Sequence, residues 1–146
     1  MTEHESMMKE SLFRNLLLAI TEGALSKCQS LIQEGAKVNG TDEYGNSPLM
    51  LAVSSPRGFL LPNMLIKVGA EVNCTNVLGE TPLLNASWAG NFGTVKLLLK
   101  HGADPNVASK TGYTALMAAA DNGHGGGSCG HCWRTVVTPM LGPIGA

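Results

Sequence analysis

The sequence predicts an all-α solenoid in which helix-turn-helix units are joined by β-hairpin-like loops and followed by a disordered C-terminal tail. Three observations predict this fold. One phrase recurs at residues 35–39, 69–73 and 102–106, as Gly-Ala-Lys-Val-Asn, Gly-Ala-Glu-Val-Asn and Gly-Ala-Asp-Pro-Asn, with starts 34 and 33 residues apart. Such a period is typical of one supersecondary unit stacked on copies of itself. Helix-start signals recur with the same spacing, and glycine accumulates after residue 123.

Composition argues against several classes of partner. The chain has 146 residues with 10 basic and 11 acidic side chains, a net charge of −1, so nothing electrostatic favours nucleic acid or an anionic membrane surface. The N-terminus is acidic where a secretory signal needs positive charge, and no apolar run approaches the ~18 residues of a membrane span. We expect a monomer of the cytoplasm or nucleus, with no membrane or nucleic-acid partner and neither cofactor nor metal.

The first helix of each unit follows a turn signal. Glycines at 45, 79 and 112 each stand two residues before a Ser or Thr that suits an N-cap, namely Ser47, Thr81 and Thr114. Proline follows Ser47 and Thr81, at a helical position where its missing N–H costs little. Short helices are therefore expected to begin at these three places, the last of them over 114–120.

A second helix closes each unit. In the clearest copy the break at 89–91 precedes an apolar stretch at 94–100 with helical spacing. His101 supplies a basic last turn, and Gly102 suits the left-handed conformation that stops a helix. The second unit has one extra residue near 54–58, which accounts for its longer interval. Each unit is thus expected to be helix, turn, helix and extended loop.

These residues resemble the ankyrin repeat, whose pattern is G-x-T-P-L-H-x-A-A-x-x-G-H-x-x-V-V-x-L-L-L-x-x-G-A-D-V-N. The nearest copy spans residues 79–106. It agrees with the pattern at Thr81, Pro82, Leu83, Ala86, Gly90, Val95, Leu97, Leu98, Leu99, Gly102, Ala103, Asp104 and Asn106. The resemblance covers about residues 10–124 and implies three to four repeats, the last one truncated.

The resemblance divides the chain into three parts. These are an N-terminal extension at 1–9, a stack at 10–124 and a Gly-rich tail at 125–146. The units of the stack are placed at 10–41, 42–75, 76–108 and, as a partial copy, 109–124. The first unit has Arg-Asn-Leu at 14–16 where the family has T-P-L, so we interpret it as an N-terminal cap. The histidine of the pattern is replaced in the four units by Leu17, Met50, Leu84 and Met117.

The tail carries the one group of side chains that suggests chemistry. Cys129 and Cys132 form a C-x-x-C that resembles the redox motif of disulfide isomerases, but no βαβ pattern adjoins it. His124 and His131 would complete a set of zinc ligands, yet structural zinc sites usually separate two ligand pairs by about a dozen residues or more. We favour a disordered tail with free thiols, and weak zinc binding stays open.

The repeat pattern also stops abruptly after residue 124. Seven of the 18 glycines lie between Gly123 and Ala146, and each costs a helix about 1 kcal/mol relative to alanine. We therefore expect no second helix in the fourth unit. An alternative hypothesis follows, in which the chain is a truncated or alternatively spliced product of a longer ankyrin protein and acts as a competitor or a poorly folded fragment.

The resemblance implies a protein-protein interaction module, an adaptor or scaffold, that binds through its loop tips and the exposed side of its first helices. No catalytic motif or phosphate-binding loop is present, so we expect no enzyme. Apolar and aromatic side chains at such exposed positions are typical binding anchors. The predicted partner-binding residues are Glu43, Tyr44, Asn46, Val77, Leu78, Glu80, Asn85, Trp88, Lys110, Thr111 and Tyr113. An alternative places Trp88 in the core, where the leucines at repeated positions are expected.

Overall fold

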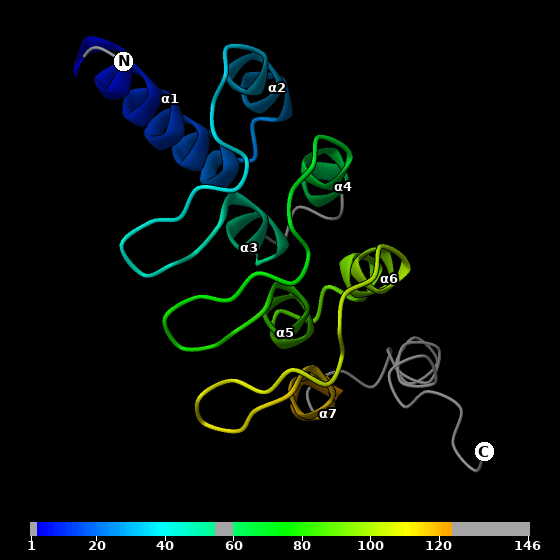
Figure 1. Ribbon diagram of the computed structural model, residues 1–146. Helices are drawn as coiled ribbons and strands as arrows, with labels where there is room; N and C mark the ends of the chain where they lie inside the picture. The colour runs from blue at the N-terminus through cyan, green and yellow to red at the C-terminus, as the bar shows by residue number, and fades with distance from the viewer. Residues whose placement is uncertain (1–2, 55–59, 124–146) are drawn as a thin grey trace.

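The computed structural model describes residues 3–54 and 60–123, and all regular structure within these ranges is helical. The first six helices pair in order along the chain, the pairs stack one below another with the seventh helix at the end, and the connecting loops project on one side (Figure 1). The helices are α1 (Glu3–Glu22), α2 (Leu25–Gln33), α3 (Pro48–Val53), α4 (Leu60–Lys67), α5 (Pro82–Trp88), α6 (Phe92–Lys100) and α7 (Ala115–Gly123). The all-α solenoid is confirmed.

Three first helices begin at the predicted caps. The Ser47 hydroxyl accepts a hydrogen bond from the Met50 N–H at 3.3 Å, and the Thr81 hydroxyl accepts one from the Leu84 N–H at 3.1 Å. Thr114 does the same for the third residue of α7, at 3.3 Å. Each cap satisfies one of the backbone donors that a helix start leaves without an intrahelical partner. The last of these helices runs to Gly123, three residues beyond the expected end at 120.

Each loop after the first unit is a tight hairpin. In the first hairpin the Asp42 N–H donates to the Asn46 carbonyl, and the Gly45 N–H donates to the Asp42 carbonyl, both at 3.0 Å. Gly45 has φ +77°, a conformation that residues with a Cβ rarely adopt. The same pair of bonds recurs in the hairpins at 76–80 and 109–113. These loops are hairpin-like in their hydrogen bonding, as predicted.

The asparagine of the first two Gly-Ala phrases joins one unit to the next. The Asn39 side chain donates to the Gly69 carbonyl at 3.0 Å and accepts from the Glu71 N–H at 2.8 Å. The Asn73 side chain repeats this with the Gly102 carbonyl at 3.0 Å and the Asp104 N–H at 2.7 Å. An amide side chain supplies both a donor and an acceptor, which explains why asparagine recurs at this position.

The core runs through all of the units between the two layers of helices. Leu49, Leu83 and Leu98 are buried as the sequence predicted, whereas Leu97 and Leu116 are only half-buried. Helix α5 packs against α3, α6 and α7, so it links the second unit to the fourth. Apolar burial of this kind is the main source of stability in a stack whose helices after α1 are too short to persist alone.

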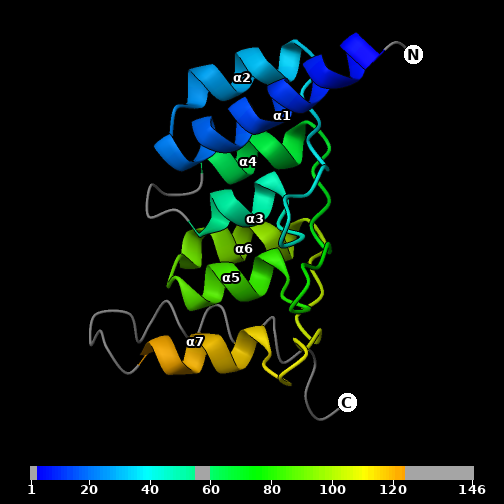
Figure 2. The same ribbon diagram turned by 90° about the vertical axis from the view of Figure 1, so that its left-hand side faces the viewer.

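The first unit differs from the prediction in its length. Helix α1 starts at Glu3 and continues for 20 residues, so the proposed boundary between residues 9 and 10 falls inside a helix. No glycine or proline interrupts 3–22, and Glu, Met, Lys and Leu are good helix formers. In Figure 2 the N-terminal part of α1 extends past the other first helices, toward the side on which the loops run.

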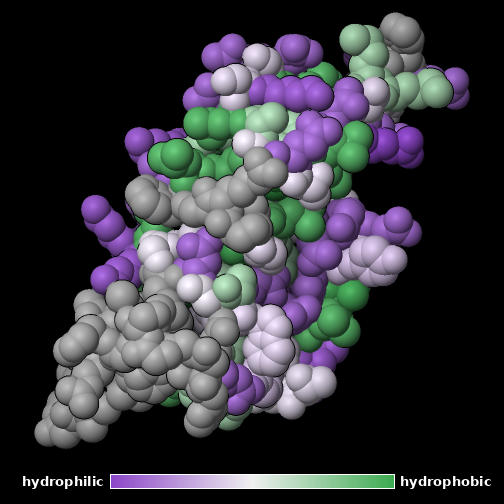
Figure 3. Space-filling view, turned by 180° about the vertical axis from the view of Figure 1, so that it is seen from behind, coloured by the Kyte–Doolittle hydropathy of each residue, from purple (hydrophilic) through white to green (hydrophobic). Residues whose placement is uncertain are grey.

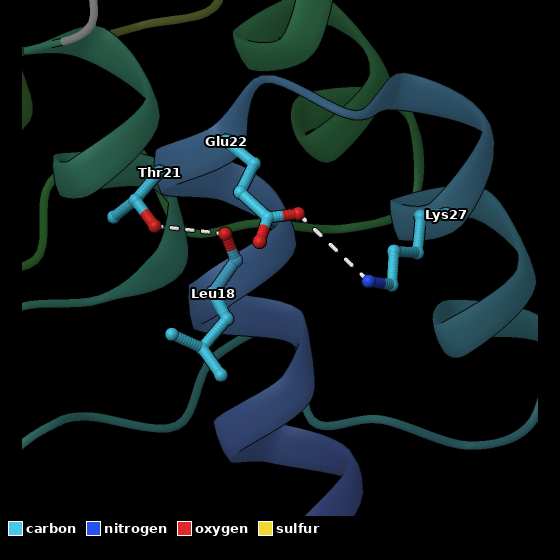
Figure 4. Close-up of polar contacts among 4 residues, drawn as sticks. All are labelled: Leu18, Thr21, Glu22 and Lys27. Carbon is cyan, nitrogen blue, oxygen red and sulfur yellow. Dashed lines mark hydrogen bonds and ion pairs between the residues drawn. The ribbon is translucent and has the colours of Figure 1, made fainter.

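The C-terminal end of α1 is held by two contacts (Figure 4). The Thr21 hydroxyl donates to the Leu18 carbonyl at 2.8 Å, and the Glu22 carboxylate lies 3.8 Å from the Lys27 ammonium across the turn to α2. Both charged side chains are more than half exposed, so the ion pair contributes about 1 kcal/mol at most. It orients the turn more than it stabilises the fold.

One buried polar group in α6 is unsatisfied, and its replacement is expected to stabilise the protein. Thr94 is fully buried and its hydroxyl has no hydrogen-bond partner among the described residues, at a position where the ankyrin pattern has valine. We expect Thr94→Val to raise the free energy of unfolding by about 1 kcal/mol, because burying an unpaired hydroxyl is costly. Thermal unfolding would show this as a midpoint higher by about 2–4 °C. Thr94→Ser, which keeps the hydroxyl and loses the methyl group, should lower it. A lower midpoint for the valine variant would contradict this explanation.

Candidate partner-binding site

The predicted binding residues come from three successive hairpins and from α5. Glu43 and Tyr44 stand at the tip of the first hairpin, Val77 and Leu78 at the second, and Lys110 and Thr111 at the third; all three hairpins project on the same side of the stack (Figure 1). Four of the apolar or aromatic side chains are at least half exposed. They are Tyr44 at 62%, Val77 at 50%, Leu78 at 58% and Trp88 at 60%.

Two aromatic rings from adjacent units meet on this face. The centroids of the Trp88 and Tyr113 rings are 5.5 Å apart and their planes are inclined at 74°, an edge-to-face arrangement. Trp88 ends α5, and Tyr113 belongs to the third hairpin. The alternative that buries Trp88 in the core is wrong, because more than half of this side chain is exposed.

The hairpin tips are held rigidly by residues that sequence reasoning missed. One Asp42 carboxylate oxygen accepts from the N–H groups of Tyr44 and Asn46, at 2.9 and 2.8 Å. Asn76 does the same in the second hairpin, for Leu78 and Glu80, both at 3.0 Å. The signal was available, since an Asp or Asn two residues before a tip is typical of an Asx turn.

A polar chain of side chains connects the first two hairpins. The Asn76 amide donates to the Asn46 side-chain oxygen and to one oxygen of the Glu80 carboxylate, each at 3.0 Å. Backbone hydrogen bonds also join neighbouring hairpins. The Val77 N–H donates to the Tyr44 carbonyl at 3.0 Å, between the first and second hairpins, and the Lys110 N–H donates to the Leu78 carbonyl at 2.9 Å, between the second and third. Asn46 and Glu80 therefore have a structural role in addition to the predicted binding role.

Two cavities lie side by side along this face. The first, of about 390 Å³, opens between the first two hairpins, and the second, of about 310 Å³, opens between the second and third. Leu78 and Glu80 line both. A volume near 300 Å³ is at the lower end of the range for ligand pockets, so each cavity has room for a side chain rather than for a cofactor.

A larger cleft of about 660 Å³ lies at the N-terminal end, between α1 and the first loop. Phe13 forms part of its wall, and the ring is so close to Gly40 that a Cβ on this glycine would lie 2.8 Å from it. Glu43 lines the cleft as well, so the first hairpin tip separates the cleft from the two cavities. The charged side chains that line the cleft are of both signs, so the cleft has no preference for an anion or a cation.

Neither cysteine of the described residues is activated. Burial raises the pKa of the Cys28 thiol, and burial likewise raises the pKa of the Cys74 thiol, whose sulfur lies 3.3 Å from the Ser47 hydroxyl. A raised thiol pKa lowers the fraction of reactive thiolate.

Within residues 3–54 and 60–123, no three His, Cys, Asp or Glu side chains lie close enough together to hold a metal ion. The suggested zinc or redox set of His124, Cys129, His131 and Cys132 lies outside the described residues, as does the expected tail. In the described part of the chain, no helix is long and apolar enough to cross a membrane.

Exposed apolar side chains are not confined to this face. Seen from behind (Figure 3), apolar surface appears along the right-hand edge, where the hairpins project, and also over the upper units. Leu18, Leu60 and Val68 are 59%, 61% and 45% exposed and belong to none of the predicted binding positions. Exposure alone therefore does not single out the hairpin side, and its distinguishing features are the two cavities and the paired rings.

Comparison with known proteins identifies the repeats. The family of ankyrin repeats in three copies matches residues 59–127. The protein named ankyrin repeat, SAM and basic leucine zipper domain-containing protein 1 is 34% identical in Colobus guereza and 36% identical in Gorilla gorilla gorilla, over 110 residues that make up 73% of this chain. A putative E3 ubiquitin-protein ligase XBAT34 of Arabidopsis thaliana is 34% identical over 126 residues, 85% of this chain. The chain spans about a quarter of the length of the first two and a third of the last (23% and 33%).

Proposed function

We propose, from the premise that this chain belongs to the ankyrin repeat family, that it binds a protein partner through its hairpin tips and the exposed side of α3 and α5. Ankyrin repeats are generally protein-protein interaction modules. The observation that carries the proposal is the row of exposed apolar and aromatic side chains, Tyr44, Val77, Leu78 and Trp88, beside two cavities on one face. Rigid hairpins support it, because a preorganised surface loses little entropy on binding.

The finer parts of the proposal concern the whole protein. We propose an adaptor or scaffold role without catalysis, as a monomer in the cytoplasm or nucleus. We also propose a division of the chain into a stack that begins with α1 and a tail from about residue 125. Protein ligands are favoured over nucleic acid or membranes because the net charge is −1. The names of the relatives describe those longer proteins, of which this chain matches 23% and 33%.

A comparative pull-down tests the binding face. The full chain would be immobilised beside the variant Tyr44→Ser, Leu78→Ser, Trp88→Ser, and both would be incubated with cell lysate after circular dichroism has established equal helix content. We expect the wild type to retain a protein that the variant loses by tenfold or more, because a few buried aromatic and apolar anchors carry most of the binding energy of an interface, about 2 kcal/mol or more each.

A matched control removes two exposed apolar side chains of a second helix. The variant Leu60→Ser, Val68→Ser changes residues at the start and just after the end of α4, where no predicted binding position lies, and it should retain the partner as the wild type does. Equal loss in both variants would mean that capture depends on general surface hydrophobicity, and equal retention in both would place the interface elsewhere. Either result contradicts the proposed face.

A further inference from the structure

The two adjacent cavities of the binding face differ in chemistry, and this difference defines a partner. The cavity between the second and third hairpins has apolar walls formed by Leu78, Leu84 and the Trp88 and Tyr113 rings. Its two charged lining residues, Glu80 and Lys110, are of opposite sign. Because the walls are mainly apolar, they fit a bulky apolar side chain such as phenylalanine or leucine.

The neighbouring cavity has one charged lining residue, Glu80. Among the described residues Glu80 forms no ion pair. One of its two carboxylate oxygens accepts a hydrogen bond from the Asn76 amide, and the described residues provide no other hydrogen bond to the carboxylate. A carboxylate can accept about four hydrogen bonds, so most of this acceptor capacity is unused. A half-buried anion with free capacity beside a cavity favours a cationic group from the partner.

The distance between the two cavities sets the distance between the apolar and the cationic side chain of the partner. The cavities are one repeat apart, and packed helices of neighbouring repeats lie about 8–10 Å apart. In a polyproline II segment, residues i and i+3 point to the same side and are about 9 Å apart, at three residues per turn. An extended β-strand does not match, because its same-side residues i and i+2 are about 7 Å apart and i and i+4 about 13 Å apart.

We propose that the partner presents a polyproline II segment with a bulky apolar residue and an arginine or lysine three positions apart. The apolar side chain enters the cavity of Trp88 and Tyr113, and the basic side chain enters the neighbouring cavity and pairs with Glu80. This proposal rests on the proposed function, because the ligand binds the same face. It goes further by specifying the chemistry, the conformation and the spacing of the ligand.

Titration of the full chain with short blocked peptides tests the proposal. The probes are Pro-Phe-Pro-Pro-Arg-Pro and its reverse-order form Pro-Arg-Pro-Pro-Phe-Pro, followed through the Trp88 indole N–H signal in ¹H–¹⁵N spectra. Trp133→Phe identifies which of the two indole signals belongs to Trp88. We expect one of the two orders to shift this signal in a saturable way at about millimolar peptide or below.

Three control peptides separate the parts of the proposal. Replacing the arginine by glutamate should weaken binding about tenfold, because a like charge meets Glu80. Replacing the phenylalanine by alanine should weaken it about tenfold or more, through the loss of apolar burial. Placing phenylalanine and arginine next to each other should weaken it similarly. If any control binds as tightly as the parent peptide, the corresponding part of the proposal is overturned.

A variant of the protein makes the test reciprocal. Glu80→Gln keeps an oxygen that can accept from Asn76 and removes the charge, so it should weaken the arginine peptide about threefold and reduce the preference over the glutamate peptide. An unchanged preference would overturn the role of Glu80.

The outcome also separates this inference from the proposed function. If no peptide binds while the pull-down retains a partner that the face variant loses, the inference fails and the function stands. Peptide binding with the expected preferences would support both the inference and the binding role of this face, whether or not the lysate supplies a partner.

Discussion

Replacing Leu83 by alanine is expected to lower the free energy of unfolding by about 3 kcal/mol. Leu83 is 1% exposed and lies on α5, the helix that packs against α3, α6 and α7. Truncation there removes apolar burial and leaves a cavity in the centre of the stack. Since small domains are stable by about 5–15 kcal/mol, this is a large share of the total. Urea unfolding followed by circular dichroism would measure it.

The matched control makes the same chemical change at the surface. Leu78 is 58% exposed at the tip of the second hairpin, so Leu78→Ala should change stability by about 0.5 kcal/mol or less. Equal losses in the two variants would mean that Leu83 does not lie in the stabilising core. A change in the slope of the denaturant dependence would instead indicate that the units no longer unfold together.

Gly45→Ala is expected to destabilise the protein by about 2–4 kcal/mol. Gly45 has φ +77°, which costs an L-residue about 1–2 kcal/mol. A Cβ would also lie 3.0 Å from the Val77 nitrogen, a backbone atom that donates to the Tyr44 carbonyl and cannot move without breaking that bond. Denaturant unfolding gives the stability, and faster hydrogen exchange of the Val77 amide would locate the damage between the first two hairpins.

Gly69→Ala isolates the backbone cost from the steric cost. Gly69 also has a positive φ, of +102°, but nothing lies within 4 Å of its Cβ position. We expect a loss of about 1–2 kcal/mol, clearly smaller than at Gly45. If the two variants lose the same stability, contact between the hairpins contributes little, and the rigidity attributed to the binding face is contradicted.

Much of the fold could be predicted because local signals and long-range contacts agree. Ser47 and Thr81 are caps in sequence and caps in structure, and each is followed by the helix that the pattern indicates. The Gly-Ala phrase recurs because its asparagine and its glycine meet partners in the adjacent unit. Because the first two copies of the phrase make the same bonds, the period predicts the stacking.

The length of α1 could not be predicted in the same way. Residues 3–9 contain no apolar period, and the interpretation as an extension relied on where the repeat pattern began. Intrinsic propensity was the better guide there, because nothing between Glu3 and Glu22 interrupts a helix. The cleft between α1 and the first loop follows from this added length and was not expected.

The composition of the binding face could be predicted only as a list of positions. Repeat register indicates that Trp88 and Tyr113 fall on the same side, but their ring contact depends on side-chain rotamers and on the spacing of two units. The structural role of Asn46 and Glu80, beside their predicted binding role, was missed for a similar reason. The Asn76 amide donates to both side chains, and Asn76 and Asn46 belong to different hairpins.

The asparagine bonds between units have a direction that bears on how such a chain can change in evolution. In both described cases the amide reaches forward, from one Gly-Ala phrase to the next along the chain. Duplicating or deleting a whole period leaves every remaining asparagine opposite a suitable glycine and amide, whereas a deletion of another length leaves both bonds unmade. The stack can therefore lengthen or shorten in whole repeats, and each step adds or removes one hairpin tip from the proposed binding face.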